Sequence, residues 1–306
     1  MQYAKETTAG TTPSPFARQT LAITGTSLNA TPNRSDSATI IDNRLKQKSP
    51  ITSVEYGGDV STELRFGAVD EFISGAAMNE WVAGTEDDDP DVLTFGGDVK
   101  KTFSILIGYT DLTGTGSYQL FKGEQVASWT LSIPEEGIIT SNFTFMGLDR
   151  QPLSTAPAGT VTPANLETAI STVGVGEILI DGVSTLNVAC LASFDFTWSN
   201  ELIQIPCLGS GLKGGKVKET NATGTGSFTM AWSDKAITLF ESQFNEDATI
   251  SLVVPITDVE GNSYKLTLPK IQITTSLPDG GMGEWLNGEI SYEVVESAPT
   301  LERLAA

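Results

Sequence analysis

The chain has 306 residues and a formal net charge of −20, from 18 basic and 38 acidic side chains, and it contains no His. A catalytic or metal site built on histidine is therefore excluded, and so acidic a chain lacks the basic stripe with which proteins ordinarily bind duplex nucleic acid. Short alternating runs rich in Thr, Ser, Gly and Val, separated by turn residues, predict a mostly β protein.

The first segment, residues 1–19, is polar and rich in Thr and Pro, so we expect an extended arm that orders on a neighbouring molecule. It lacks the charged and apolar regions of a signal peptide, and no apolar run in the chain approaches the roughly 20 residues that span a membrane. We therefore expect a protein made in a cytosol, with no membrane partner. Its two cysteines, Cys190 and Cys207, are then expected to be reduced and buried.

Strand-like material follows from residue 20, and then the apolar spacing changes. Val60 and Leu64 alternate with polar residues after Gly58, which is typical of a half-buried strand. Apolar residues next recur at the spacing of one helical face, which predicts a helix over 68–80. The predicted core positions of this strand and helix are Leu64, Val69, Phe72, Ile73 and Ala76.

The segment 84–98 is acidic and shows no apolar period, so we expect a solvated surface loop. Its Asp residues lack the alternating ligand positions and the glycine of a calcium loop. Strand patterns resume near residue 100 and continue to about residue 150. The stretch 151–176, with its three prolines, is the best candidate for a linker.

The second half repeats the order of the first. Gly226 follows Gly58 at an offset of 168 residues and again begins a strand, which includes Trp232. A second one-faced helix is predicted over 234–245, with Ile237, Phe240 and Phe244 on its apolar face. Later blocks also correspond, such as Tyr118 with Tyr264, Pro134 with Pro278 and the runs "NFTF" and "EISY".

This colinearity predicts an internal duplication. The expected domains are 20–150 and 177–297, with a tail at 298–306. The expected fold is two tandem copies of a β-sandwich or barrel unit, each with one flanking α-helix.

No segment carries a recognisable catalytic pattern. "GSGLKGG" lacks the spacing of a phosphate loop, and the adjacent acids Glu135 and Glu136 lie in a predicted turn. We therefore expect a protein that is not an enzyme and that binds no cofactor and no metal. A repeated β unit without a site is typical of a ring or filament component.

The ordered set of motifs resembles the major tail tube proteins of long-tailed, non-contractile bacteriophages. The resemblance spans about residues 20–295 and rests on "GTSLNATPNRSDSATIIDNRLKQK", "GGDVSTELRFGAVDEFISGAAMNEW", "YTDLTGTGSYQLFKGEQ", "GTGSFTMAWSDKAITLFESQF" and "VEGNSYKLTLPKI". It implies a structural subunit of the virion tail, made and assembled in the host cytoplasm. Subunits would stack as rings around a channel through which DNA passes without specific binding.

The resemblance also implies partners and an arrangement. The partners would be other copies of the chain, a tape-measure protein and the tip or terminator proteins of the tail. Two fused copies per chain would fill six wall positions with a homotrimer, and the arm and linker would make ring-to-ring contacts. An acidic lumen would repel DNA phosphates. The candidate lining residues are Asp59, Glu63, Glu124, Glu219 and Thr229.

The main alternative is a two-domain β-sandwich binding module, such as a lectin, an adhesin or a virion decoration protein. Exposed Trp198 or Trp285 would then serve as sugar platforms.

Overall fold

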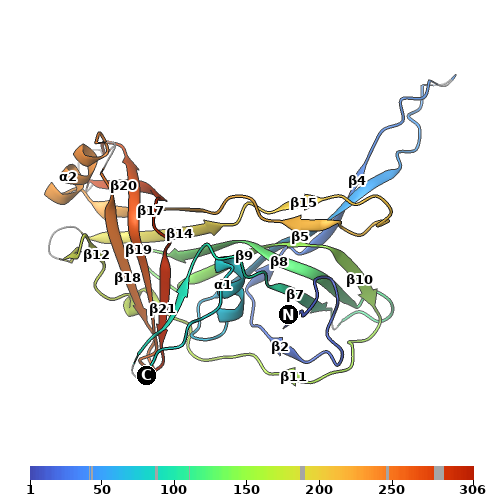
Figure 1. Cartoon of the computed structure of the whole chain (residues 1–306), viewed down its shortest axis with the longest axis horizontal. Coiled ribbons are helices and arrows are strands. Elements are labelled where there is room, and N and C mark those ends of the chain that lie inside the picture. The colour runs from blue at the N-terminus through green and yellow to red at the C-terminus, as the bar shows by residue number, and fades with distance from the viewer. Residues whose placement is uncertain are drawn as a thin grey trace.

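Antiparallel strands dominate the structure, as the sequence predicts. The computed structural model describes residues 1–306 apart from 41, 43, 87, 88, 110, 187–189, 246, 247 and 279–285. Strands account for 48% of the chain and helices for 7%, which confirms the mostly β prediction. The two α-helices, α1 (Asp70–Ala77) and α2 (Asp234–Ser242), lie in different halves of the molecule (Figure 1).

The first half contains a row of five strands with a sixth beside it. In order across the sheet these are β5 (Ile51–Glu63), β9 (Thr140–Gly147), β8 (Tyr118–Ile133), β7 (Thr102–Gly108) and β1 (Gln2–Lys5). β10 (Asp149–Leu153) pairs with the beginning of β8, on the edge opposite β7.

The second half contains a row with the same pairing order. Its strands are β17 (Thr223–Ala231), β20 (Asn287–Val294), β19 (Ser263–Thr275), β18 (Ile250–Thr257) and β12 (Leu179–Ile180). β21 (Thr300–Leu304) pairs with the beginning of β19, as β10 pairs with β8.

The registers of the two rows also correspond. Gly58 is opposite Phe145 in the first row, and Gly226 is opposite Tyr292 in the second. These are the residues that the sequence comparison placed in equivalent positions.

One strand joins the two rows. β14 (Leu191–Ser199) pairs with β17 on one edge and with the end of β8 on the other, where Phe196 is opposite Leu131. With β4 (Asn29–Arg34) beside β5, the result is an eight-stranded antiparallel run in the order β4-β5-β9-β8-β14-β17-β20-β19. The remaining short elements are β2 (Arg18–Thr20), β3 (Gly25–Thr26), β6 (Asp91–Thr94), β11 (Val161–Thr162), η1 (Thr172–Gly174), β13 (Val183–Ser184), β15 (Ile203–Ile205) and β16 (Lys216–Lys218).

Helix α1 packs its predicted apolar face into the core. Val69, Phe72, Ile73 and Ala76 are each at most 1% exposed, and Leu64 before them is 2% exposed. Gly75 lets the helix approach β7 and β8, because a Cβ there would lie 3.2 Å from the ring of Phe103 and 3.3 Å from Val126. The i, i+3, i+4 spacing in the sequence was therefore sufficient to find this helix.

Helix α2 occupies its predicted place but buries a different face. The Ser233 hydroxyl accepts a hydrogen bond from the Ala236 amide and caps the helix. Ala236 and Leu239 are buried, whereas Ile237 is 44% exposed and Phe244 is 71% exposed. The predicted face was therefore wrong for these two residues, and the rings of Phe240 and Trp232 are only partly buried. α1 lies under β8, β14 and β6, whereas the chief contact of α2 is with β19.

Neither terminus is a free segment. In the region expected to be an arm, β1 pairs with β7, and Tyr3 and Phe16 are buried. Arg18 donates to the carbonyl of Pro157 at 2.9 Å. The expected tail contains β21, which completes the second row. Both predictions are corrected, because short polar segments can become strands when an edge is available to pair with them.

The expected linker is also packed against the first row. The amide of Ile170 donates to the carbonyl of Leu64, and the Ile170 carbonyl accepts from Ile139, both at 2.9 Å. Ile170 is 2% exposed. Three prolines in this stretch therefore mark an irregular path over the domain surface and not a separate spacer.

The acidic segment 84–98 is only partly a surface loop. Thr85, Glu86 and Asp89 are exposed, as expected, but the segment then forms β6, which pairs with β21. Leu93 is fully buried, and Phe95 stacks on Trp129 with ring centroids 5.6 Å apart. The short apolar alternation at 93 and 95 was missed beside the run of carboxylates.

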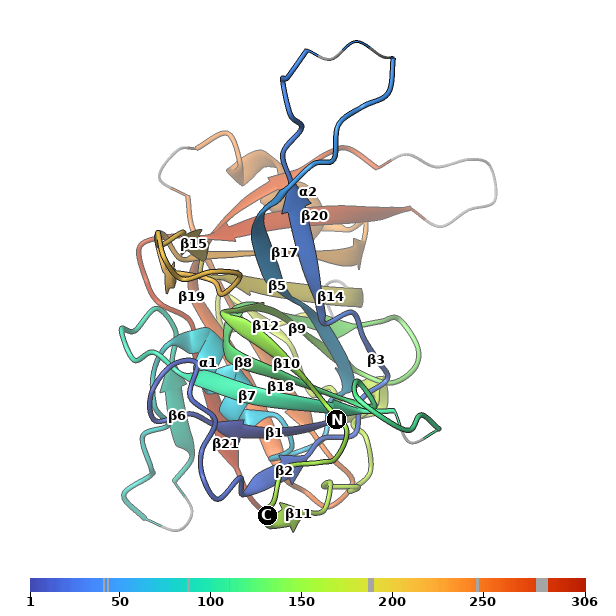
Figure 2. The same ribbon diagram turned by 90° about the vertical axis from the view of Figure 1, so that its right-hand side faces the viewer.

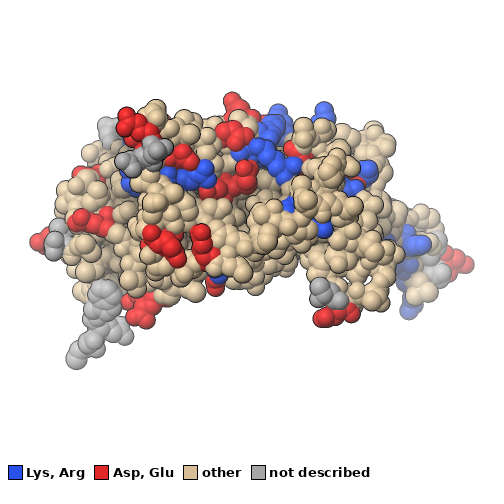
Figure 3. Space-filling model, turned by 90° about the horizontal axis from the view of Figure 1, so that it is seen from below, with Lys and Arg blue, Asp and Glu red and all other residues tan. Residues whose placement is uncertain are grey.

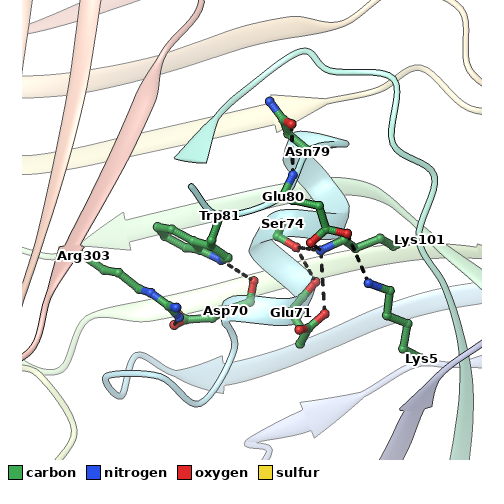
Figure 4. A network of polar contacts seen from close by, with 9 residues as sticks. All are labelled: Lys5, Asp70, Glu71, Ser74, Asn79, Glu80, Trp81, Lys101 and Arg303. Atoms are coloured by element: carbon green, nitrogen blue, oxygen red, sulfur yellow. Dashed lines mark hydrogen bonds and ion pairs between the residues drawn. The ribbon is translucent and has the colours of Figure 1, made fainter. Parts of the chain in front are cut away.

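Charged side chains connect α1 to β21 and to neighbouring segments of the first half (Figure 4). Arg303 on β21 forms ion pairs with Asp70 and, at 2.9 Å, with Asp91, and its guanidinium lies 4.6 Å from the centre of the Trp81 ring. On the other side of the helix, buried Lys101 pairs with Glu80 at 2.6 Å. Because every buried charge here has a partner, the network fixes α1 against both halves of the chain.

The two cysteines are more exposed than the sequence suggested. Cys190 and Cys207 are both free, and both are exposed where burial was expected. No helix in the described part of the chain has the length and hydropathy needed to cross a membrane.

A polar sheet face as the candidate functional site

The eight-stranded run has two chemically opposite faces. One face carries the large apolar residues of the core, such as Phe143, Phe196 and Phe228, all at most 1% exposed. Alternation places the other set of side chains on the opposite face. That set, the polar face, consists almost entirely of hydroxyl, amide and carboxyl side chains. Its central members are Asp59, Ser61, Asn142, Thr144, Ser128, Thr130, Asp195, Thr197, Ser227, Thr229, Glu289 and Ser291.

The polar face has a one-sided charge. No Lys or Arg occurs in the segments that form most of it, 29–33, 53–63, 128–132, 140–146, 193–199, 223–229, 272–274 and 287–293, whereas Arg34, the last residue of β4, pairs with Ile51 at the outer end. The same segments contain six acidic residues, and the alternation places all of them on the polar face: Glu55, Asp59, Glu63, Asp195, Glu289 and Glu293. A surface with this excess of carboxylates repels phosphate groups.

Hydrogen bonds between neighbouring strands hold these polar groups in place. The Thr144 hydroxyl donates to the Asp59 carboxylate at 2.7 Å, and the Asp59 amide donates to the hydroxyl of Ser27 at 2.8 Å. At the junction of the two halves, Ser132 donates to Asp195, and the hydroxyls of Thr130 and Thr197 lie 3.0 Å apart. The polar face is therefore continuous across the junction.

Three of the five predicted lining residues lie on the polar face. Asp59 and Glu63 are on β5, and Thr229 is on β17. The Glu63 carboxylate also forms an ion pair with Arg65, which lies just beyond the end of β5. Sequence alternation was the signal that found these three residues.

Glu124 does not reach any surface of the chain, so its assignment to a lining is corrected. Its side chain is fully buried, and its carboxyl group packs against Gly147, where a Cβ would lie only 2.0 Å from Oε1. Burial, reinforced by the nearby Glu6 carboxylate, raises the pKa of Glu124 to about 8. A bulge between Val126 and Ser128 shifts the alternation of β8, which is why parity counted from the sequence failed here.

Glu219 lies outside the polar face. It precedes β17 and forms an ion pair with Lys100 at 2.6 Å. Trp198, a proposed sugar platform, is 5% exposed and packs near Phe95 in the core. Trp285, the other proposed platform, lies outside the described residues.

The two ends of the eight-stranded run are open edges within the described part of the chain. The outer edge of β4 faces no other strand, and Gln272–Thr275 of β19 pair with β20 on one side only, with the Thr275 amide donating to the Gln243 side chain at 3.1 Å. Leu277, just beyond β19, is 64% exposed. Open edges of this kind pair readily with another chain. Sequence reasoning missed them, because edge position depends on the fold and not on local composition.

The chain was compared with known proteins. A family model described as "Phage tail tube protein" matches residues 1–289. No curated protein matches the chain.

Proposed function

The chain belongs to the phage tail tube protein family, and from this premise we propose that three copies close into a ring whose polar face lines the DNA channel of the tail. Family membership makes the chain a structural subunit of the virion tail and suggests self-assembly into a tube. The ring of three chains, the strand register between chains and the charge of the channel wall go beyond family membership, and these we propose.

The proposed duplication rests on topology. Both halves use the same pairing order, and both place an extra strand, β10 or β21, at the beginning of the long central strand. Each half also carries one α-helix directly after the first strand of its row. We infer that two neighbouring wall units were fused, so that three chains supply six units.

Ring closure follows from the junction inside the chain, and this observation carries the proposal. β14 of the second half pairs with the end of β8 of the first, with Phe196 opposite Leu131. The equivalent of β14 is the β3–β4 edge, and the equivalent of β8 is β19. The offset of 168 relates Phe196 to Leu28, and the offset of 146 between Tyr118 and Tyr264 relates Leu131 to Leu277. If two copies repeat this junction, the edge of β4 in one copy pairs with the end of β19 in the next, with Leu28 opposite Leu277.

The burial of these two residues agrees with this pairing. Leu28 is already buried within the chain, at 9% exposure. Leu277 is 64% exposed, so pairing would remove its apolar surface from water. Pairing would also leave no open edge, because a sheet that closes on itself has no edge strands, whereas the sheet of a single free chain has two. The interface is head to tail, so a rotation that closes gives a ring.

A lumen lined by the polar face would act by repulsion. At about 0.15 M salt, electrostatic repulsion decays over roughly 8 Å, which is far enough to keep a duplex away from the wall of a narrow channel. Over the part of this face that has no Lys or Arg, the wall forms no cationic phosphate contacts that would have to break as DNA moves. The resemblance described above adds a non-contractile tail, assembly in the host cytoplasm, and tape-measure, tip and terminator proteins as partners.

Negative-stain electron microscopy with light scattering tests the proposal. The purified protein should give rings or hollow rods, and its smallest closed species should have three times the mass of the chain. Compact monomers at every concentration tested would refute the ring.

A further inference from the structure

A long hairpin of the second half lies across the first half. Between β14 and β17 the chain extends through residues 199–223, which include β15 and β16, and runs over β5 and the end of β9 (Figure 1). The Tyr56 hydroxyl donates to the Leu212 carbonyl, and the Gly214 amide donates to the Leu148 carbonyl, both at 2.7 Å. Lys213 and Asp149 add an ion pair at 3.6 Å. This hairpin therefore has a docking site within its own chain.

The first half has an equivalent hairpin of the same length. Residues 31–55, which comprise the end of β4, the connection after it and the beginning of β5, correspond to 199–223 at the constant offset of 168. In the free chain this hairpin projects away from the body of the molecule (Figure 2), and Ile40 is 96% exposed. Nothing within the described part of the chain occupies the role that β5 and β9 have for its counterpart.

The docking site also has an equivalent, on the second half. By register, Tyr56 corresponds to Gly224, and Gly147 and Leu148 correspond to Val294 and Val295. These residues lie at the ends of β17 and β20, at the opposite end of the molecule from the projecting hairpin (Figure 1). One chain therefore cannot bring its own hairpin to this site.

The hairpin is slightly basic. Residues 31–55 carry Arg34, Arg44, Lys46 and Lys48 against three acids, Asp36, Asp42 and Glu55, within an otherwise acidic protein, and Lys46 pairs with Asp36. In the view from below, basic and acidic side chains both occur at the projecting right-hand end (Figure 3). Beside the equivalent docking site, Glu296 is exposed and pairs with Lys270 at 2.6 Å, whereas Glu293 lies on the polar face. Attraction between Glu296 and the basic hairpin would help direct the encounter between copies.

We propose that residues 31–55 of one copy dock on the ends of β17 and β20 of the next copy, repeating the contact that 199–223 makes inside the chain. The inference rests on the proposed ring, because the hairpin leaves β4 directly beside the neighbour that β4 pairs with. It adds a second contact to the edge pairing and identifies the occupant of this surface as another copy of the chain. The contact should bring Lys46 next to Val295, as Gly214 lies next to Leu148.

A designed disulfide tests this contact. Cys190 and Cys207 are exposed, so both are first replaced by Ser, and then Lys46→Cys is combined with Val295→Cys, where Cys and Val have similar volumes. After assembly and mild oxidation, non-reducing electrophoresis should show covalent dimers and trimers. The matched control, Lys46→Cys with Glu260→Cys at the exposed β18–β19 turn, should stay monomeric.

Electron microscopy of each sample in reducing buffer separates the two proposals. Rings or rods that yield only monomers on the oxidised gel, or yield as much cross-linking from the control pair, would overturn the hairpin contact and leave the ring standing. Absence of rings or rods for the unmodified protein would refute the ring, and the hairpin contact with it.

Discussion

At the scale of single residues, Glu124 has the most unusual environment. Both of its carboxyl oxygens are buried without a hydrogen-bond partner, next to Gly147 and near the carboxylate of Glu6. Glu6 itself is well supported, because it accepts hydrogen bonds from Ser104 at 2.6 Å and from the Gly123 amide at 3.0 Å. The proton therefore belongs to Glu124, whose pKa is raised to about 8.

This raised pKa predicts that stability falls with rising pH. The protonated form is favoured in the folded chain, so the contribution of Glu124 is fully present below about pH 4.5 and is lost as pH rises to about 8. Glu124→Gln keeps the shape but cannot ionise. Thermal unfolding between pH 5 and pH 8 should show a smaller loss of melting temperature for the variant than for the unmodified chain. Equal losses would show that Glu124 ionises without penalty.

At the scale of elements, β21 and β6 depend on Arg303. This side chain neutralises Asp70, which is 6% exposed and also accepts a hydrogen bond from the Tyr264 hydroxyl at 2.5 Å. Arg303→Ala would leave that carboxylate buried without a cation and should cost roughly 3 kcal/mol of unfolding free energy.

The neighbouring pair Lys265–Glu302 provides the control, because it joins β21 to β19 at 2.6 Å and neither of its side chains is as buried as Asp70. Lys265→Ala should cost less than about 1 kcal/mol. Urea unfolding of both variants measures the difference. Similar losses for the two would contradict the role given to Arg303.

The open edge at the end of β19 gives a prediction about assembly. Leu277→Lys places a charge where an apolar contact with Leu28 of the next copy is proposed. Because Leu277 is 64% exposed, the fold should keep its melting temperature while ring formation is lost. Val259→Lys, at a 78% exposed position in the β18–β19 turn, is the matched control and should assemble normally. Sedimentation of the assembled material measures both, and normal assembly of Leu277→Lys would argue against this edge.

The elements that sequence reasoning found are those with long apolar periods. α1 and the long strands bury the residues expected of them, because a repeated spacing makes one face apolar whatever the neighbours are. The elements it missed are short strands that exist only because an edge is available to them. β1, β6 and β21 were assigned to an arm, a loop and a tail. The apolar face predicted for α2 was wrong for a related reason, because the face that a helix buries depends on which elements pack against it.

The polar face was partly predictable for the same reason. Asp59, Glu63 and Thr229 follow regular alternation on straight strands. Glu124 lies where β8 bends through a bulge, and Glu219 lies in a connection, so alternation could not place either of them. The scarcity of Lys and Arg on this face became visible only when eight separate strands were placed side by side.

At the scale of the whole molecule, the N-terminal segment is packed into the first half of the chain. Deleting residues 1–18 would remove β1 from the edge of β7 and expose the sites of Tyr3 and Phe16, which are 7% and 2% exposed. Loss of a single buried aromatic side chain typically costs about 3–5 kcal/mol, so the truncated chain should unfold or aggregate. Circular dichroism and soluble yield measure this. If the truncated chain were soluble and melted cooperatively, the segment would be a separable arm, as expected from the sequence.

In the assembled tube, we expect three chains to close their open edges into a single sheet whose acidic polar face surrounds the channel. A cryo-electron microscopy reconstruction of the self-assembled tube tests it most directly. The account predicts three chains per ring, Leu28 opposite Leu277 at each interface, and Asp59, Asp195 and Glu289 facing an electronegative lumen. A ring with another number of chains, or a channel wall formed by a different face and lined with Lys or Arg, would contradict it.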